Sequence, residues 1–131
     1  MSQSGGLTVD GAPITAAAAV VAGDTGALAA SAGTATLAAA VGKTTYLSGL
    51  CVTGLGATAA AVVDVTVTGP AATLHFPFAV PAGATLTAVP LYLDVDPPIP
   101  GAAPNTAVVV NVPSFGVGNT SARGSAYGYQ A

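Results

Sequence analysis

Hydrophobic and polar residues alternate one by one along five runs of the chain, at residues 61–68, 74–80, 91–96, 108–112 and 122–129. In the second run, Leu74, Phe76 and Phe78 fall on one face, and His75 and Pro77 fall on the other. Successive side chains of a β-strand point to opposite faces, so this period of two predicts strands with one face suited to a core. Half-buried strands of this kind are typical of antiparallel sheets.

Clusters of glycine, proline and asparagine separate these runs and predict turns. They recur roughly every 10 to 15 residues, which is typical of β-sandwiches and jelly rolls. Pro77 lies inside a strand-like run. Because proline has no amide hydrogen to donate, we expect that strand to lie at a sheet edge or to be bulged there. The turn segments are Gly54-Leu55-Gly56, Gly69-Pro70, Pro81-Ala82-Gly83, Pro97-Pro98 through Pro104-Asn105, and Phe115 through Asn119.

The first third of the chain is rich in alanine, the strongest helix former, which would favour helices at residues 15–22 and 27–41. Threonine, valine and glycine recur in both segments, however, and their apolar residues are often spaced by two. We therefore predict one or two strands between Ile14 and Val41. Residues 1–12 are small, polar and glycine-rich, and are predicted to form a flexible arm. Residues 1–131 thus predict one all-β domain, an antiparallel β-sandwich resembling a jelly roll, with a flexible N-terminal arm.

The chain carries very few charges for its size. Of its 131 residues 5% are charged and 52% are hydrophobic, whereas an ordinary soluble domain has about 25% charged residues. A surface of threonine, serine, alanine, glycine and backbone has few ions to desolvate when a neighbour covers it. The composition therefore favours an oligomer or a component of a larger assembly.

The charge pattern argues against two classes of partner. The net charge is −3, and the cations are Lys43 and Arg123 alone. Two isolated cations cannot form the clustered basic surface that nucleic acids or anionic lipids require. The alanine-rich stretch from Thr15 to Gly42 is interrupted by Asp24 and by several polar residues, so it does not predict a membrane span.

Two further features bear on where the protein is made. Residues 1–6 lack the basic region of a signal peptide, so we expect synthesis in the cytoplasm. Cys51 is the single cysteine, which excludes an intrachain disulfide, and we interpret it as a buried neutral thiol. Without a secretory signal, the glycosylation sequon at Asn119-Thr120-Ser121 is interpreted as a chance match.

Few residues suit catalysis or metal binding. His75 is the only histidine and no nucleophile elbow is present, so we interpret it as a strand residue facing solvent or an interface. Asp94 and Asp96 lie two residues apart on a strand and so point to one face. They could bind Ca²⁺ with help from carbonyl groups, or serve as paired acids, but we favour an exposed strand end before the proline-rich loop. No catalytic, cofactor-binding or metal-binding residue is assigned.

Aromatic residues on otherwise polar strand faces provide the candidate interface. Tyrosine suits interfaces because its ring buries area while its hydroxyl keeps a polar contact. Two interpretations stand side by side: a subunit contact, or sandwich strands buried on both faces. Val62 has a similar position, and the candidate interface residues are Tyr92, Val109, Arg123, Tyr127 and Tyr129.

Several segments carry a likeness to a known group of proteins. The segments are Thr44-Thr45-Tyr46-Leu47-Ser48-Gly49, Val52-Thr53-Gly54, Asp64-Val65-Thr66-Val67-Thr68-Gly69, Val80-Pro81-Ala82-Gly83-Ala84, Pro98-Ile99-Pro100, Asn105-Thr106-Ala107-Val108-Val109-Val110, Val112-Pro113-Ser114-Phe115-Gly116 and Gly118-Asn119-Thr120. Together they resemble small β-rich virion proteins of tailed bacteriophages, of the head decoration or cement type, over roughly residues 41–130. The alanine-rich first third does not share the likeness.

The resemblance implies a jelly-roll-like subunit, often a homotrimer, that sits on the outer capsid surface of the virion. It would bind neighbouring major capsid proteins and stabilise the contacts between them. It implies no catalytic residue and no cofactor. The competing hypothesis is a carbohydrate-binding or adhesion module of a phage tail or fibre, since jelly rolls also serve as lectins. A hydrolase that uses His75 is the least favoured hypothesis.

Overall fold

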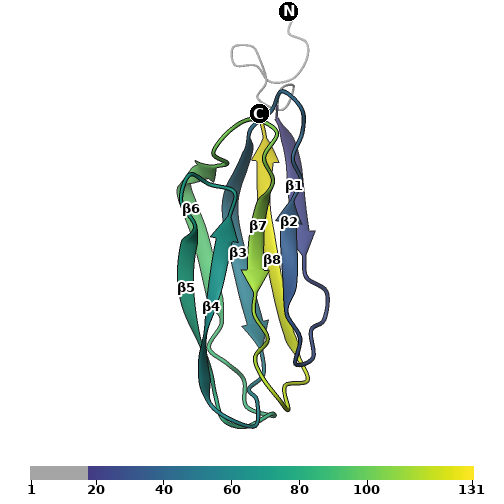
Figure 1. The fold of residues 1–131 in the computed structure, drawn as a ribbon, viewed down its shortest axis with the longest axis vertical. Coiled ribbons are helices and arrows are strands. Elements are labelled where there is room, and N and C mark those ends of the chain that lie inside the picture. The colour runs from purple at the N-terminus through teal and green to yellow at the C-terminus, as the bar shows by residue number, and fades with distance from the viewer. Residues whose placement is uncertain (1–17) are drawn as a thin grey trace, which may run out of the picture.

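The computed structural model describes residues 18–131, in which the chain forms an elongated β-sandwich (Figure 1). The predicted arm at residues 1–12 lies outside the described residues. The strands are β1 (Ala19–Asp24), β2 (Gly33–Leu37), β3 (Thr45–Gly54), β4 (Ala61–Thr68), β5 (Leu74–Val80), β6 (Leu91–Pro100), β7 (Val108–Val112) and β8 (Ala122–Gln130).

The first strand pairs with the last, the second with the last but one, and so on towards the middle of the sequence. β1 pairs with β8, β2 with β7, β3 with β6 and β4 with β5, each time antiparallel. Further pairing of β3 with β8 and of β4 with β7 joins them into two four-stranded sheets, β1-β8-β3-β6 and β2-β7-β4-β5. This is the strand order of a jelly roll, so the predicted fold class is confirmed.

The core lies between the two sheets and follows from the alternation in the sequence. In β8 every second residue from Ala122 to Gln130 is buried, while Arg123 and Tyr127 between them are exposed. Phe78 and Phe115 stack near one end of the core, with ring centroids 5.0 Å apart. The largest fully buried side chains are Phe115, Leu37, Leu47, Leu50, Val52, Val65, Val67, Val108, Val110, Val112 and Thr45.

The first third of the described chain forms strands, as predicted. β1 and β2 both lie within the alanine-rich segment, and they occupy one edge of each sheet. The two strands approach each other closely at Gly23, where a Cβ atom would lie 2.5 Å from the carbonyl oxygen of Thr36. Strand spacing therefore overrides the helix propensity of alanine, since only a strand presents every second side chain to the core.

The prolines that fall within strands lie on edge strands. Pro77 is in β5, at the edge of its sheet as expected. The expectation of a loop from Pro97 was wrong in part, because β6 continues to Pro100 along the edge of the other sheet. An edge strand tolerates proline because one side of its backbone has no strand to pair with.

Buried side-chain amides and hydroxyls close the ends of the sandwich. At one end Thr45 Oγ1 and Gln130 Nε2 both donate to the carbonyl of Ala38, at 2.8 and 2.7 Å. At the other end the Asn119 amide donates to the carbonyls of Leu55, Gly56 and Ser121, at 2.9, 3.0 and 3.2 Å. Asn119 is 4% exposed, so folding removes the sequon amide from reach of a glycosylating enzyme. Residues 18–131 hold no helix that is long and apolar enough to cross a membrane.

Candidate protein interface

All four tyrosines of the chain lie on the outer face of the sheet β1-β8-β3-β6. Tyr46 comes from β3, Tyr92 from β6, and Tyr127 and Tyr129 from β8. We call this surface the tyrosine face. Strand register brings the four together: Tyr129 is opposite Tyr46, and Tyr127 is opposite Gly49, which is itself opposite Asp94.

Tyr127 lies flat across the neighbouring strand. A Cβ atom on Gly49 would lie 2.4 Å from both Cζ and the hydroxyl oxygen of the Tyr127 ring, so the ring covers the bare backbone of Gly49. At its far end the Tyr127 hydroxyl donates a hydrogen bond to Asp94 Oδ1 on β6. With 47% of the residue exposed, the outer face of the ring is open to a partner.

The Asp94 contact changes the acidity of Tyr127. The hydrogen bond to Asp94 raises the pKa of Tyr127 above its ordinary value of 10.0, with smaller contributions from desolvation and from the negative charge of the carboxylate. Both the hydrogen bond and the charge favour the neutral phenol. Tyr127 therefore remains an uncharged donor up to a higher pH than an ordinary tyrosine.

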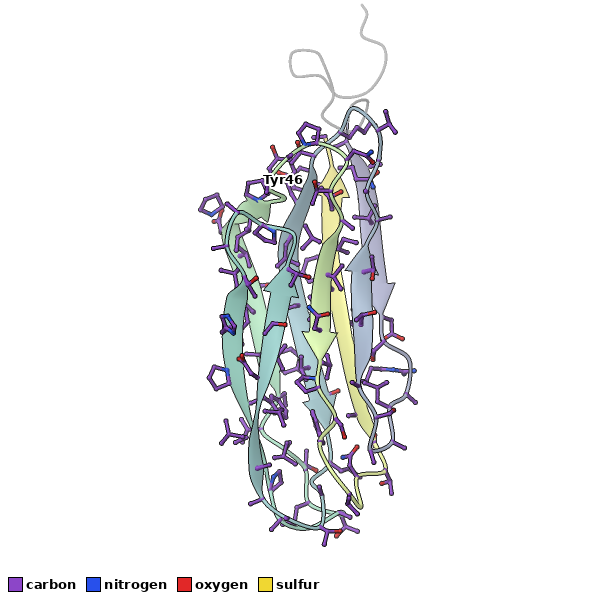
Figure 2. The ribbon with its side chains drawn as sticks, in the orientation of Figure 1. Tyr46 is labelled. Carbon is purple, nitrogen blue, oxygen red and sulfur yellow. The ribbon has the colours of Figure 1, made fainter. Side chains whose placement is uncertain are left out.

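The other three tyrosines differ in how far they are packed. Tyr46 and Tyr129 stack on each other, with ring centroids 4.8 Å apart and an angle of 11° between the rings. Tyr46 lies near the end of the sandwich where β3 begins (Figure 2). Tyr92 projects from the edge strand β6 and is 71% exposed, so nothing in residues 18–131 covers it. The tyrosine face thus combines a packed aromatic pair with two open rings.

Some carboxylates on the tyrosine face have a cationic partner nearby, and others do not. Asp24 on β1 accepts a hydrogen bond from Ser125 at 3.0 Å and lies 3.5 Å from Arg123 Nε. Asp94 and Asp96 on β6 are both exposed, and no Lys, Arg or His of residues 18–131 lies within 4 Å of either carboxylate. The β6 side of the face therefore presents uncompensated negative charge.

Four of the five candidate interface residues lie together. Tyr92, Arg123, Tyr127 and Tyr129 share the tyrosine face, whereas Val109 lies on β7 in the opposite sheet. Cys51, which we expected to be buried, is only partly buried and lies between Tyr92 and Ser125 in the register of the tyrosine face. Its outward direction follows from the alternation of β3, in which Leu50 and Val52 are the buried neighbours.

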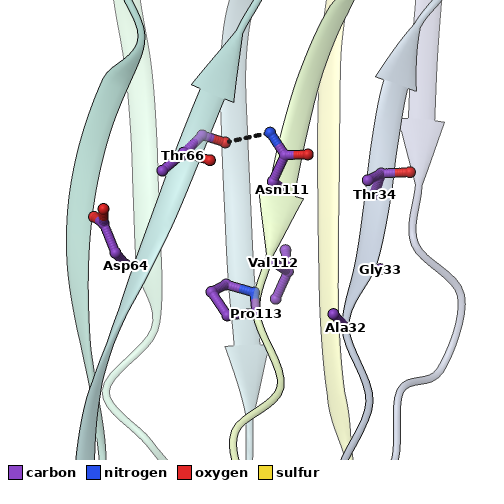
Figure 3. A pocket seen from close by; sticks show the side chains of 8 residues that line it. All are labelled: Ala32, Gly33, Thr34, Asp64, Thr66, Asn111, Val112 and Pro113. Atoms are coloured by element: carbon purple, nitrogen blue, oxygen red, sulfur yellow. Dashed lines mark hydrogen bonds between the residues drawn. The ribbon is translucent and has the colours of Figure 1, made fainter.

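The opposite sheet presents a different surface, which is rich in hydroxyl groups. Thr34, Asn111 and Thr66 lie side by side in one row across β2, β7 and β4. Below this row β4 has no partner on its β7 side, and a shallow hollow of about 380 Å³ opens there (Figure 3). Most of its exposed lining is apolar, and the residues around it include the hydroxyl and amide groups of Thr34, Thr66 and Asn111. The hollow is lined by Ala32, Gly33, Thr34, Asp64, Thr66, Asn111, Val112 and Pro113.

His75 lies beside this hollow and has a partner that the sequence did not reveal. Its Nδ1 atom is 2.6 Å from Asp64 Oδ2, and both side chains are more than half exposed. His75 therefore faces outward, as expected from its place in the strand. Residues 18–131 contain no group of three or more His, Cys, Asp or Glu side chains that could hold a metal ion.

Two parts of the tyrosine face were missed in the sequence. Tyr46 was not assigned to the candidate interface because β3 has a bulge at Ser48, which puts the alternation before it out of phase with the alternation after it. Gly49 was missed because glycine gives no signal of the ring that covers it. The period of two in residues 91–96 and 122–129 was the signal that located the other tyrosines.

Comparison with known proteins gives no relative. No family model, no curated protein and no solved structure matches this chain.

Proposed function

We propose that this protein is a structural component of a phage virion, a decoration or cement subunit that binds the outer capsid surface through its tyrosine face. The proposal combines the resemblance of residues 41–130 with a surface that carries few charges. In it the partner is the major capsid protein, and the subunit stabilises contacts between neighbouring capsid proteins. Its role is binding and not catalysis.

The observation that carries the proposal is the gathering of four tyrosines on one sheet face. Tyrosine is enriched in protein interfaces, and residues that contribute most to binding are often tyrosine, tryptophan or arginine. A sheet face is also rigid, so little conformational freedom is lost when it docks. The 71% exposed ring of Tyr92 and the flat ring of Tyr127 give that face two anchors.

The proposal includes self-association, with a homotrimer expected from the resemblance. A trimer would present three tyrosine faces to a repeating capsid lattice, and linked binding sites gain avidity without any new contact. Native mass measured in solution tests this part of the proposal. A trimer supports it, and a monomer at all accessible concentrations removes it while leaving docking to be tested separately.

Docking is tested by mixing the purified chain with phage particles that lack it and measuring how much co-sediments. We expect saturable binding that Tyr92→Ala or Tyr127→Ala weakens by roughly tenfold or more, because truncating a central tyrosine costs about 2 kcal/mol in many interfaces. Val62→Ala is a matched control, since Val62 is 73% exposed on the opposite sheet. No binding of the unaltered chain, or equal loss in all three variants, contradicts the proposal.

A second candidate function is supported by the hollow on the opposite sheet. Its Asp64 carboxylate, Asn111 amide and threonine hydroxyls are the groups that hydrogen-bond sugar hydroxyls. This surface fits a carbohydrate-binding or adhesion module. A glycan array decides between the two functions. A specific glycan whose binding is lost in Asp64→Asn would favour adhesion, and an array without signal would exclude the adhesion function.

A further inference from the structure

The two sides of the tyrosine face differ in charge: on the β1–β8 side a carboxylate is paired with an arginine, whereas the β6 side is acidic. From β1 and β8 the charged groups on the face are Asp24 and Arg123, which lie 3.5 Å apart. β3 contributes none, and β6 contributes Asp94, with Asp96 exposed two residues further along the same strand. The two open rings lie on the β6 side, because Tyr92 precedes Asp94 on the same strand face and Tyr127 reaches Asp94 across Gly49.

We propose that this side of the tyrosine face recognises an arginine side chain of the protein partner, stacked on the Tyr127 ring and paired with Asp94. The inference rests on the proposed docking function and names the chemistry of its partner. We call the three residues Tyr92, Asp94 and Tyr127 the arginine cradle.

The geometry of Tyr127 fits a guanidinium group. One side of the ring rests on Gly49, so the other side is a flat aromatic surface that is open to a partner. A guanidinium stacks on such a surface and is attracted by the negative face of the ring. Because Asp94 lies at the hydroxyl end of the same ring, a guanidinium stacked on the ring lies beside the carboxylate and can donate an N–H to it.

Asp94 has an oxygen free for this contact. Its Oδ1 atom accepts the Tyr127 hydroxyl, and within residues 18–131 that is the hydrogen bond found for its carboxylate. The Oδ2 atom is therefore open to a donor. Lysine is a compact point charge and cannot stack and donate in one plane, so arginine is favoured over lysine.

Charge also favours arginine over a neutral ligand such as a sugar, which can stack on tyrosine as well. Docking that covers the face takes Asp94 and Asp96 out of water, and burying unpaired carboxylates is costly. A cation from the partner offsets that cost, while a neutral ligand leaves it in place. The single arginine of this chain cannot serve within the same subunit without leaving Asp24.

The test uses the full chain with labelled tyrosine rings, followed by NMR. The probe is the peptide acetyl-Gly-Arg-Gly-Arg-Gly-amide, compared with the same peptide carrying lysine and with N-acetylglucosamine. We expect saturable shifts of the Tyr92 and Tyr127 rings with a dissociation constant on the order of 1–10 mM, because each exposed contact is weak. The lysine peptide should bind several-fold more weakly.

Two carboxylate variants make the test specific. Asp94→Asn should weaken binding of the arginine peptide several-fold, whereas Asp64→Asn removes the same charge from the opposite sheet and should leave it unchanged. Equal effects of the two variants, equal binding of both peptides, no saturable shift, or tighter binding of the sugar would each overturn the arginine cradle.

A failure here is distinguishable from a failure of the proposed function. If Tyr92→Ala and Tyr127→Ala abolish co-sedimentation with particles while the arginine peptide does not bind, docking through the tyrosine face stands and the arginine assignment is wrong. If neither tyrosine variant affects co-sedimentation, the docking face itself is wrong, and the inference that rests on it falls as well.

Discussion

Tyr127 shows how one residue connects three strands of the jelly roll. It starts on β8, crosses Gly49 on β3 and donates to Asp94 on β6. The large side chain thus fills the space that glycine leaves on the sheet surface, an arrangement that also fixes the direction of the ring. The position of the ring follows from packing, and the raised pKa of its hydroxyl follows from Asp94.

The first prediction concerns the acidity of this residue. Asp94→Asn removes the negative charge, so the pKa of Tyr127 should fall towards 10.0. Because the folded pKa is raised, the stability that the Tyr127 contact contributes is present below the unfolded pKa of about 10 and is lost as pH rises through the folded value. Ultraviolet titration of phenolate, with Tyr127→Phe to assign the signal, measures the shift. A Tyr127 pKa that is the same in the Asp94→Asn variant contradicts the contact.

The second prediction concerns the amide that joins two loops. Asn119→Ala removes a donor shared by the carbonyls of Leu55, Gly56 and Ser121, so the free energy of unfolding should fall by about 1–3 kcal/mol. Asn111→Ala is the control, since its amide contacts are all 3.4 Å long and should cost about 0.5 kcal/mol or less. Urea denaturation compares the two. Equal costs would show that the Asn119 amide does not hold the loops.

At the scale of elements, β1 and β2 depend on a close approach of their backbones. Gly23→Ala places a Cβ atom 2.5 Å from the carbonyl oxygen of Thr36, so the two edges must separate. We predict a loss of about 1–3 kcal/mol in unfolding free energy, the usual cost of overpacking. Ala22→Ser, on the exposed neighbour, should change it by about 0.5 kcal/mol or less. A Gly23→Ala variant as stable as Ala22→Ser would show that the edges are not packed.

Elements could be predicted from the sequence wherever alternation is unbroken. Residues 61–68, 74–80, 108–112 and 122–129 read directly as strands because their buried and exposed positions alternate. β3 could not be predicted in this way because Ser48 is an extra residue in the ladder. As a result, Leu47 and Leu50 point to the same face although they are three residues apart. Proline was misleading in β6, because edge position cannot be seen in a linear sequence.

The sequence could not show which residues of the site lie next to one another in the folded protein, and the reason is physical. Alternation shows which residues of one strand share its outward face. It predicted that Tyr92 and Asp94 share one such face, and that Tyr127 and Tyr129 share another. It does not state which strands are neighbours, and the neighbours here are far apart in the chain, such as β1 with β8. The separation of Val109 from the tyrosines, and the pairing of His75 with Asp64, both depend on that strand order.

For the whole molecule, the two sheet faces divide the surface into different chemistries. The tyrosine face carries aromatic rings and uncompensated carboxylates, and the opposite face carries threonines and a shallow hollow. Such a division suits a subunit that docks by one face and leaves the other exposed. Low overall charge, 5% of residues, lowers the desolvation cost of the docked state.

The most direct test of this account is hydroxyl-radical footprinting of the chain, free and bound to phage particles. The account predicts that Tyr92 and Tyr127, open in the free chain, become protected several-fold on the particle, while Val62 and His75 on the opposite sheet keep their reactivity. Tyrosines that react equally in both states, or protection confined to Val62 and His75, would show that the protein does not dock through its tyrosine face.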